Sequence, residues 1–286
     1  MSTRVEDLFS ISGKVVAVTG AAGVLYSNIS KALAENGAKV ALLDILGDKT
    51  AELAEEINNA GGEAIGIECS VLDADQIQAA LQQIIGAWGR CDVLLNGAGG
   101  NQKAATVPPD GVFTELSPDA LGRVFALNYT GTFLPSQIFC RHFAERGTGC
   151  IINTSSMAAL APLTNVPGYS NAKAAVSNLT RWLAVQVKVD FPDADIRVNE
   201  IAPGFLVTTQ NRGLLYADEE CTELTQRGHS IISHTPQDRF GEPLELVGGL
   251  ILLMSEAGSF INGVTLPIDG GFDAYSGVGP LDEKKK

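Results

Sequence analysis

The segment Lys14–Tyr26, KVVAVTGAAGVLY, decides the fold. Its β-branched run up to Thr19 predicts a buried strand, and the pattern from Val24 to Asn36 predicts a helix. A glycine-bearing turn between a first strand and a first helix lets a pyrophosphate approach the backbone N–H groups of the helix N-terminus. The turn is not a G-x-G-x-x-G motif, because its first two glycines lie one residue further apart and a third glycine is absent. An ordinary strand–helix turn therefore remains an alternative.

Short apolar runs and helical patterns alternate along the rest of the chain. Further strands are expected at Lys39–Leu43, Glu63–Glu68, Asp92–Leu95, Cys150–Thr154, Ile196–Ile201 and Val264–Ile268. Helices are expected at Lys49–Ala60, Ala74–Trp88, Pro118–Glu145, Tyr169–Val189 and Leu244–Ser255. Continuous apolar strands between helices indicate a parallel sheet that is buried on both faces.

We therefore predict one α/β domain over residues 1–286, a Rossmann fold with a doubly wound parallel sheet of about seven strands flanked by helices. The longest stretch without strong periodicity, residues 204–243, is expected to form a substrate loop over the site. Residues 270–286 are expected to form a C-terminal tail.

Composition excludes several classes of protein. Apolar residues make up 45% of the chain and charged residues 19%, which indicates a sizeable core. The net charge of −13 argues against a nucleic-acid-binding surface. The five cysteines are irregularly spaced without C-x-x-C, and the three histidines form no ligand motif, so neither disulfides nor a metal site is expected. Without a signal-peptide core or an 18-residue apolar run, we expect a soluble cytoplasmic protein.

Asp44 ends the second predicted strand, 24 residues after Gly20. A carboxylate at this position accepts both ribose hydroxyls of an adenosine and repels a 2′-phosphate, and no Arg or Lys follows directly. This favours NAD over NADP, with a helix-capping Asp as the alternative. The run Asn96–Gly100, NGAGG, follows the fourth predicted strand and allows a backbone to pass close to a ligand.

Tyr169 and Lys173 lie four residues apart, so a helix places both on one face. A nearby ammonium favours the phenolate and would lower the phenol pKa toward neutrality. Such a tyrosine could give or take a proton near pH 7. The pair alone is weak, since Y-x-x-x-K often arises by chance.

Taken in order, these segments resemble the short-chain dehydrogenase/reductase family over nearly the whole chain. The matching segments are TGAAGVLY at 19–26, NGAG at 96–99, LNYTG at 127–131, INTSS at 152–156, YSNAK at 169–173 and APGFLVT at 202–208, together with Asp44. The resemblance implies a catalytic tetrad of Asn128, Ser156, Tyr169 and Lys173.

In that resemblance Tyr169 is the general acid/base on the substrate oxygen, and Ser156 donates a hydrogen bond to the same oxygen. Ser156 is preferred over Ser155 because the family's serine lies thirteen residues before its tyrosine. Lys173 lowers the phenol pKa and holds the nicotinamide ribose, and Asn128 helps to hold a proton-relaying water chain. Hydride moves directly between cofactor and substrate carbon, so no metal is needed.

The resemblance and the residue patterns together give a set of expected NAD contacts. These are Gly20, Ala22, Gly23, Val24, Leu25, Asp44, Ser70, Val71, Asn96, Gly97, Ala98, Gly99, Tyr169, Lys173, Pro203, Gly204, Leu206 and Thr208. Three positions depart from the family pattern: Tyr26 stands where a third glycine is usual, Ser70 replaces an Asp near the adenine, and Gly97 replaces an Asn.

Several local segments look like one subgroup, the D-mannonate oxidoreductases or fructuronate reductases. They are NGAGGN at 96–101, FLVTTQNRGLL at 205–215, HTPQDRFGEP at 234–243 and GGFDAYSGV at 270–278. A sugar-acid substrate needs local positive charge, for which Lys103, Arg212, His234 and Arg239 are candidates. Arg212 is preferred for its bidentate geometry, and Arg239 is expected to form a structural ion pair. The expected substrate contacts are Asn101, Ser156, Gln210, Asn211 and Arg212.

Two other functions stay open. One is a gluconate 5-dehydrogenase or another polyol dehydrogenase, and the other is a non-catalytic nucleotide sensor. The family also implies a homotetramer, with the helices near Pro118–Glu145 and Tyr169–Val189 across one interface.

Overall fold

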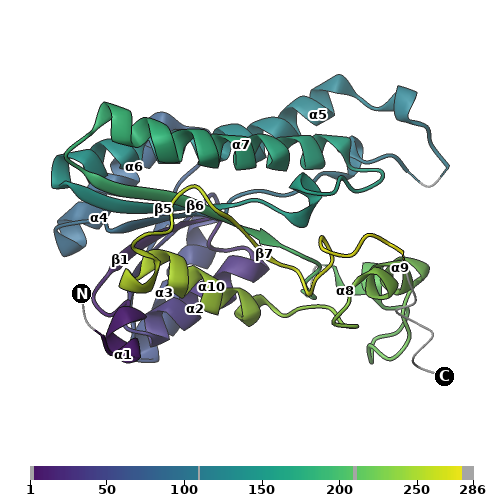
Figure 1. The fold of residues 1–286 in the computed structure, drawn as a ribbon, viewed down its shortest axis with the longest axis horizontal. Coiled ribbons are helices and arrows are strands. Elements are labelled where there is room, and N and C mark those ends of the chain that lie inside the picture. The colour runs from purple at the N-terminus through teal and green to yellow at the C-terminus, as the bar shows by residue number, and fades with distance from the viewer. Residues whose placement is uncertain (1–2, 109, 209–210, 279–286) are drawn as a thin grey trace.

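The computed structural model describes residues 3–108, 110–208 and 211–278. Seven parallel strands form one sheet in the order β3-β2-β1-β4-β5-β6-β7, which confirms the predicted architecture (Figure 1). The strands are β1 (Val15–Thr19), β2 (Lys39–Asp44), β3 (Glu63–Glu68), β4 (Val93–Asn96), β5 (Thr148–Thr154), β6 (Asp195–Pro203) and β7 (Thr265–Ile268).

Helices cover both faces of this sheet (Figure 1). The α-helices are α1 (Val5–Leu8), α2 (Val24–Glu35), α3 (Gly47–Asn59), α4 (Ala74–Trp88), α5 (Pro118–Phe125), α6 (Gly131–Arg146), α7 (Pro167–Asp190), α8 (Arg212–Leu215), α9 (Gln226–His234) and α10 (Val247–Met254). Short 3-10 turns are η1 (Lys103–Ala105), η2 (Phe113–Glu115), η4 (Met157–Ala159), η5 (Pro243–Leu246) and η6 (Glu256–Gly258).

The core has two layers because successive residues of a strand point to opposite faces. On β1, Val16 and Val18 pack with α2, α3 and α10, whereas Val15 and Ala17 pack with α4, α6 and α7. All four side chains are at most 1% exposed. Burial on both faces explains why the strands lack a polar alternation in the sequence.

The strand order reverses between β1 and β4, and this switch point positions the site. From β1 the chain winds outward to β2 and β3, and it then returns to the other side of β1 at β4. In doubly wound sheets, ligands bind in the crevice that such a reversal opens at the carboxyl ends of the strands. Both glycine-containing runs, Gly20–Gly23 and Asn96–Gly100, follow the carboxyl ends of these two strands.

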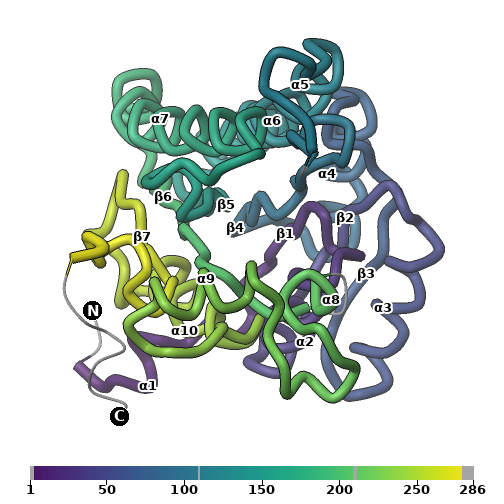
Figure 2. Tube along the Cα trace, turned by 90° about the vertical axis from the view of Figure 1, so that its right-hand side faces the viewer, coloured from purple at the N-terminus to yellow at the C-terminus, as the bar shows by residue number. Residues whose placement is uncertain are grey.

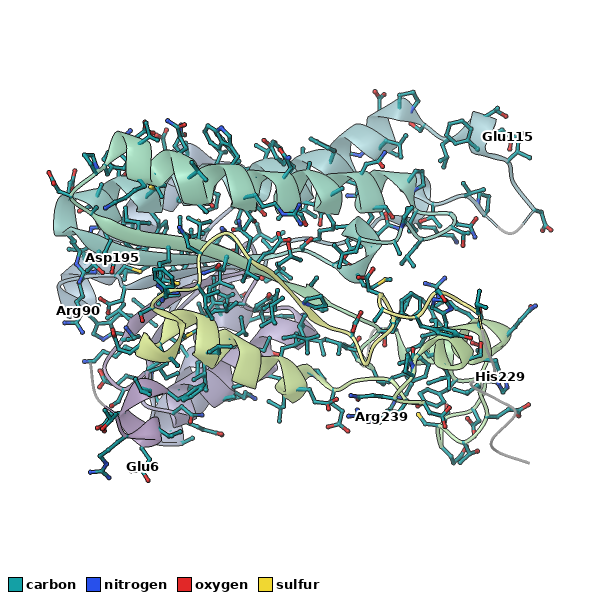
Figure 3. All side chains as sticks on the ribbon, in the orientation of Figure 1. Glu6, Arg90, Glu115, Asp195, His229 and Arg239 are labelled. Atoms are coloured by element: carbon teal, nitrogen blue, oxygen red, sulfur yellow. The ribbon has the colours of Figure 1, made fainter. Side chains whose placement is uncertain are left out.

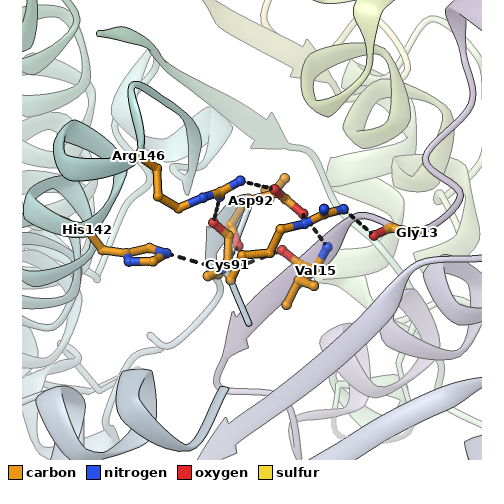
Figure 4. A network of polar contacts seen from close by, with 8 residues as sticks. Gly13, Val15, Cys91, Asp92, His142 and Arg146 are labelled. Atoms are coloured by element: carbon orange, nitrogen blue, oxygen red, sulfur yellow. Dashed lines mark hydrogen bonds and ion pairs between the residues drawn. The ribbon is translucent and has the colours of Figure 1, made fainter. Parts of the chain in front are cut away.

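The amino ends of β1 and β4 are joined by a network around Asp92 (Figure 4). Asp92 Oδ2 accepts the Val15 N–H at 2.8 Å and the Arg90 Nε–H at 3.0 Å, and its Oδ1 lies 3.0 Å from an Arg146 nitrogen. Burial alone would raise the pKa of Asp92, but these hydrogen bonds and the two guanidinium charges lower it below its ordinary value. The network therefore holds the charged carboxylate at the end of the sheet opposite the crevice.

The predicted helix Pro118–Glu145 is interrupted at Asn128. A π-helical turn, η3 (Ala126–Thr130), separates α5 from α6. The Asn128 Nδ2 group donates to the Val124 carbonyl at 2.8 Å and thereby competes with the regular backbone hydrogen bond of the helix. Such π turns concentrate at functional sites.

The predicted loop 204–243 contains two helices, α8 and α9, at the end of the molecule that faces the viewer in Figure 2. The Thr225 hydroxyl caps α9 by accepting the Gly228 N–H at 3.0 Å. Leu215, Ile231 and Phe240 form a small separate core beneath them. With so few apolar residues, α9 is too short to show a clear helical period in the sequence.

No helix in the described ranges is long and apolar enough to cross a membrane.

Candidate active site

The four predicted catalytic residues come from three separate parts of the chain. Asn128 lies in the π turn η3, Ser156 follows β5, and Tyr169 and Lys173 occupy neighbouring turns of α7. The Lys173 Nζ atom lies 5.7 Å from the centroid of the Tyr169 ring. The Ser156 hydroxyl lies close enough to the Tyr169 phenol to favour its ionised form. The fold thus brings the serine, the tyrosine and the lysine together.

Of the two adjacent serines, Ser155 is directed away from Tyr169. Its Oγ pairs with the Ser177 Oγ at 2.7 Å and donates to the Lys173 carbonyl at 3.2 Å. Ser155 therefore connects the end of β5 to α7 by hydrogen bonds, and Ser156 is the serine that faces the phenol of Tyr169.

Asn128 is fully buried and holds the backbone of Gly100 on both sides. Its Oδ1 accepts the Gly100 N–H at 3.1 Å, and its Nδ2 donates to the Gly100 carbonyl at 2.7 Å. A Cβ atom on Gly99 would lie 2.6 Å from the Asn128 Oδ1 and 3.1 Å from the Lys173 Nζ. Only glycine at position 99 lets these two polar side chains approach the loop so closely.

Lys173 is 3% exposed, and its Nζ donates to the Thr154 carbonyl at 2.8 Å. Burial lowers its pKa from 10.5 to about 8, and the nearby Glu200 opposes this change. Glu200 is itself fully buried and accepts hydrogen bonds from Thr180 at 3.0 Å and Thr265 at 2.6 Å. The ammonium is therefore poised to exchange a proton near neutral pH.

The pKa of Tyr169 moves in the opposite direction from the one predicted from its neighbour Lys173. Burial raises the Tyr169 pKa, and the nearby Ser156 hydroxyl only partly offsets this. The physical reason is that the ammonium donates to the Thr154 carbonyl and lies over the ring, so water exclusion dominates at the phenol.

A cleft of about 370 Å³ runs from the glycine turn to this constellation. Eleven of the predicted cofactor residues line it: Gly20, Gly23, Val24, Leu25, Asp44, Val71, Gly97, Ala98, Gly99, Tyr169 and Lys173. Gly100 also lines the cleft, as expected for the run Asn96–Gly100. Sequence reasoning missed Ile45, Cys69, Leu127 and Thr154, and it named Tyr26 only as a departure. The sequence offered a signal for two of them, because Ile45 directly follows the predicted Asp44 and Leu127 directly precedes the predicted Asn128.

The other predicted cofactor residues do not line this cleft, namely Ala22, Ser70, Asn96, Pro203, Gly204, Leu206 and Thr208. Asn96 is buried and donates to Ser136 at 2.9 Å and to Asn153 at 2.8 Å, so it joins neighbouring elements of the core. The Ala22 N–H donates to the Asp44 Oδ2 at 3.1 Å, and the Asp44 Oδ1 accepts the Leu46 N–H at 3.1 Å. Asp44 therefore holds the glycine turn and also lines the cleft.

Two departures from the family pattern, Tyr26 and Gly97, occupy one space. The Tyr26 side chain is 3% exposed, and its hydroxyl pairs with the Thr154 hydroxyl. A Cβ atom on Gly97 would lie 2.5 Å from the Tyr26 ring. The absence of a side chain at position 97 therefore makes room for the ring that replaces the third glycine.

Besides Ser156, two of the predicted substrate residues have side chains that are engaged in local hydrogen bonds. The Asn101 Nδ2 donates to Thr106 at 2.8 Å, and the Asn211 side chain bonds the backbone of Leu206 and Thr208. Arg212 is exposed on α8, and Gln210 lies outside the described residues.

Arg239 forms a two-pronged ion pair with Glu245, at 2.6 and 2.7 Å, as expected. A second cavity is lined by residues of α9 and by the segment Ala161–Asn165. Figure 3 places His229 of α9 and Glu115 at the same end of the molecule, far from Arg90 and Asp195.

No group of three or more His, Cys, Asp or Glu side chains that could hold a metal ion occurs in the part of the chain that the structure describes.

Comparison with known proteins places these features in a family. The short chain dehydrogenase profile matches residues 14–219. A Haemophilus influenzae structure with bound NAD, provisionally described as a D-mannonate oxidoreductase, is 44% identical, with a TM-score of 0.86 over 94% of this chain and 98% of that one.

Two further relatives act on related compounds. The 5-keto-D-gluconate 5-reductase of Escherichia coli strain K12 is 32% identical over 93% of this chain and 98% of its own. A gluconate 5-dehydrogenase from Burkholderia cenocepacia, solved with NADP and tartrate, is 29% identical, with a TM-score of 0.82 over 95% of this chain and 99% of that one. The chain belongs to the short-chain dehydrogenase family of oxidoreductases.

Proposed function

We propose that this oxidoreductase transfers hydride between NAD and a sugar acid, with D-fructuronate and D-mannonate as the ketone and alcohol. The observation that carries the proposal is the convergence of Ser156, Tyr169 and Lys173 at the end of the cleft. The likeness to the NAD-bound Haemophilus influenzae protein supports both the cofactor and the substrate.

The cleft residues fit a nicotinamide dinucleotide. The Gly20–Gly23 turn precedes the N-terminus of α2, where backbone N–H groups favour phosphate. Asp44 offers carboxylate oxygens to the adenosine ribose, and Lys173 lies at the opposite end of the same cleft, beside Tyr169. When bound, the cofactor supplies or accepts the hydride.

The protein's part of the reaction is proton transfer at Tyr169. A phenol whose pKa is raised by burial stays protonated at neutral pH, so it can donate its proton to a substrate carbonyl oxygen during reduction. Ser156 would donate a second hydrogen bond to the oxygen that gains charge. Lys173, with a pKa of about 8, can return a proton to the phenol, and Asn128 fixes the loop that borders both groups.

The second candidate is a gluconate 5-dehydrogenase, which is favoured by the likeness to the Escherichia coli 5-keto-D-gluconate 5-reductase. Both candidates share the site and act on the fifth carbon counted from the carboxylate; their alcohols, D-mannonate and D-gluconate, differ in configuration at the carbon next to the carboxylate. A nucleotide sensor without turnover would not need the Ser156–Tyr169–Lys173 arrangement.

We also propose that the protein is a homotetramer. Trp182, Val185 and Val189 form an exposed apolar stripe on α7, with exposed fractions of 54%, 68% and 67%. Phe260 is fully exposed near β7. Such patches are typical of surfaces that associate.

The substrate is tested by offering D-fructuronate or 5-keto-D-gluconate with NADH to the purified protein and following NADH absorbance. We expect a higher kcat/KM for D-fructuronate. Tyr169→Phe should lower kcat by about 10²–10⁴-fold, because the proton donor is lost, without weakening NADH binding measured by fluorescence. Turnover of 5-keto-D-gluconate alone would identify the second candidate, and unchanged kcat in the variant would exclude Tyr169 as the acid.

The cofactor preference is tested with Asp44→Asn. The amide keeps one oxygen for the glycine turn but removes the charge that repels a 2′-phosphate. We expect the NADH affinity to fall about tenfold and the ratio of kcat/KM for NADH over NADPH to shrink. A melting curve checks that the turn is intact; an unchanged ratio with an intact fold would show that Asp44 does not select the cofactor.

The buried Lys173 ammonium should reduce the stability of the protein. Because its pKa is lowered from 10.5 to about 8, charging it penalises the folded state below pH 8, and the penalty fades as pH rises toward 10.5. Lys173→Met should therefore raise the free energy of unfolding by about 1–3 kcal/mol at pH 7 while abolishing turnover.

Urea denaturation between pH 7 and pH 10.5 measures the difference in the free energy of unfolding between the variant and the wild-type protein. We expect this difference to shrink toward zero as the pH rises to 10.5. Lys188→Met, on the exposed end of the same helix, is the matched control and should show no gain. A Lys173→Met gain that does not change with pH would contradict the assigned cause.

Light scattering measures the oligomeric state. We expect four chains per particle, and we expect Trp182→Glu to give smaller particles, because it places a charge in the apolar stripe. A monomeric wild-type protein would contradict the proposal.

A further inference from the structure

The largest cavity described at the substrate end is separate from the cofactor cleft. Its volume is about 830 Å³, and it lies between α9 and the segment Ala161–Asn165. That segment is part of the chain that joins Ser156 to Tyr169, so the cavity is bordered by the connection between two residues of the active site. Phe205, two residues after β6, and Phe272 form its apolar side.

The remaining lining has four aliphatic residues, Ala161, Pro162, Leu163 and Ile231, and is otherwise polar without an acidic group. It contains two basic side chains, Arg227 and His234, and no Asp or Glu. Its other polar side chains bear hydroxyl or amide groups: Thr164, Asn165, Gln226, Ser230 and Ser233. In a chain of net charge −13, a cavity without carboxylates is a selective environment for an anion.

Arg227 differs from the other arginines near the site. Arg239 is held by Glu245, and exposed Arg212 does not line the cavity. Within the described ranges, Arg227 makes no hydrogen bond or ion pair, so its guanidinium is free to bind a ligand.

The element that carries Arg227 is well anchored. The Thr225 hydroxyl caps α9, and the His234 ring at its other end packs against Phe272 at 4.6 Å and Tyr275 at 4.9 Å between ring centroids. A fixed helix places both basic groups on the cavity without the cost of ordering a loop on binding.

We propose that Arg227, assisted by His234, binds the carboxylate of the substrate, and that the hydroxyl-bearing residues of the same cavity bind its hydroxyl groups. The site therefore takes an open-chain polyhydroxy acid whose reacting carbon reaches Tyr169 while its carboxylate lies beside α9. This inference rests on the proposed function for its substrate class, and it replaces Arg212 as the residue expected to bind the carboxylate.

The test uses probes that do not require turnover. D-gluconate and D-glucitol have the same chain length and differ in a terminal carboxylate, and calorimetry measures their binding to the NADH-loaded protein. We expect D-gluconate to bind more tightly, and Arg227→Gln to weaken its binding by about 10–100-fold, since a charge-assisted hydrogen bond is lost. D-glucitol binding should change less than twofold, and Arg227→Lys should keep part of the preference.

Arg212→Gln is the matched comparison, because it removes the same charge from α8. If it abolishes the preference for D-gluconate and Arg227→Gln does not, the carboxylate lies at the outer loop and the proposal is wrong. Equal binding of both probes by the wild-type protein also overturns it. A protein that prefers D-gluconate through Arg227 but does not turn over D-fructuronate would retain this inference and lose only the proposed substrate.

Discussion

The burial of one ammonium group, Lys173, is the constraint on which the site depends. A lowering of its pKa from 10.5 to about 8 corresponds to roughly 3 kcal/mol, a large share of the net stability of a domain. The fold tolerates this cost by surrounding the lysine with acceptors: the Thr154 carbonyl lies at 2.8 Å, and Glu200 is buried behind it. Glu200 is in turn held by Thr180 and Thr265, so polar groups of β6, β7 and α7 contribute to the surroundings of the ammonium.

The sequence predicted the parts of the molecule that obey local rules. Strands buried on both faces are continuous apolar runs, so the bounds of β1 and β3 were predicted to within a residue. Tyr169 and Lys173 share a helix face by spacing alone. By contrast, the hydrogen bond from the Asn128 side chain to Gly100 joins residues that lie 28 positions apart, and it cannot be inferred from helical period.

Long-range packing also explains two departures from the family pattern that the sequence alone did not explain. Tyr26 and Gly97 each depart from the family pattern. In the structure, the ring of Tyr26 fills the space that a side chain at position 97 would take. The two changes compensate for each other, and the hydroxyl of Tyr26 reaches Thr154, whose carbonyl holds Lys173. A family motif is therefore a set of mutual contacts, and residues in it can change together without loss of shape.

The same argument applies to the substrate end, where net charge and local charge have opposite signs. Screening limits surface electrostatics to about 8–10 Å at physiological salt, so the distant carboxylates that give the chain its net charge act weakly inside a cavity lined by Arg227 and His234. The helix that carries both residues, α9, could not be recognised from its period. The sequence therefore offered His234 as one candidate, did not single out Arg227, and favoured Arg212 for its bidentate geometry. In the proposed carboxylate site, the basic groups are those that α9 turns toward the cavity, and their placement depends on the packing of His234 against Phe272 and Tyr275, which sequence periodicity does not report.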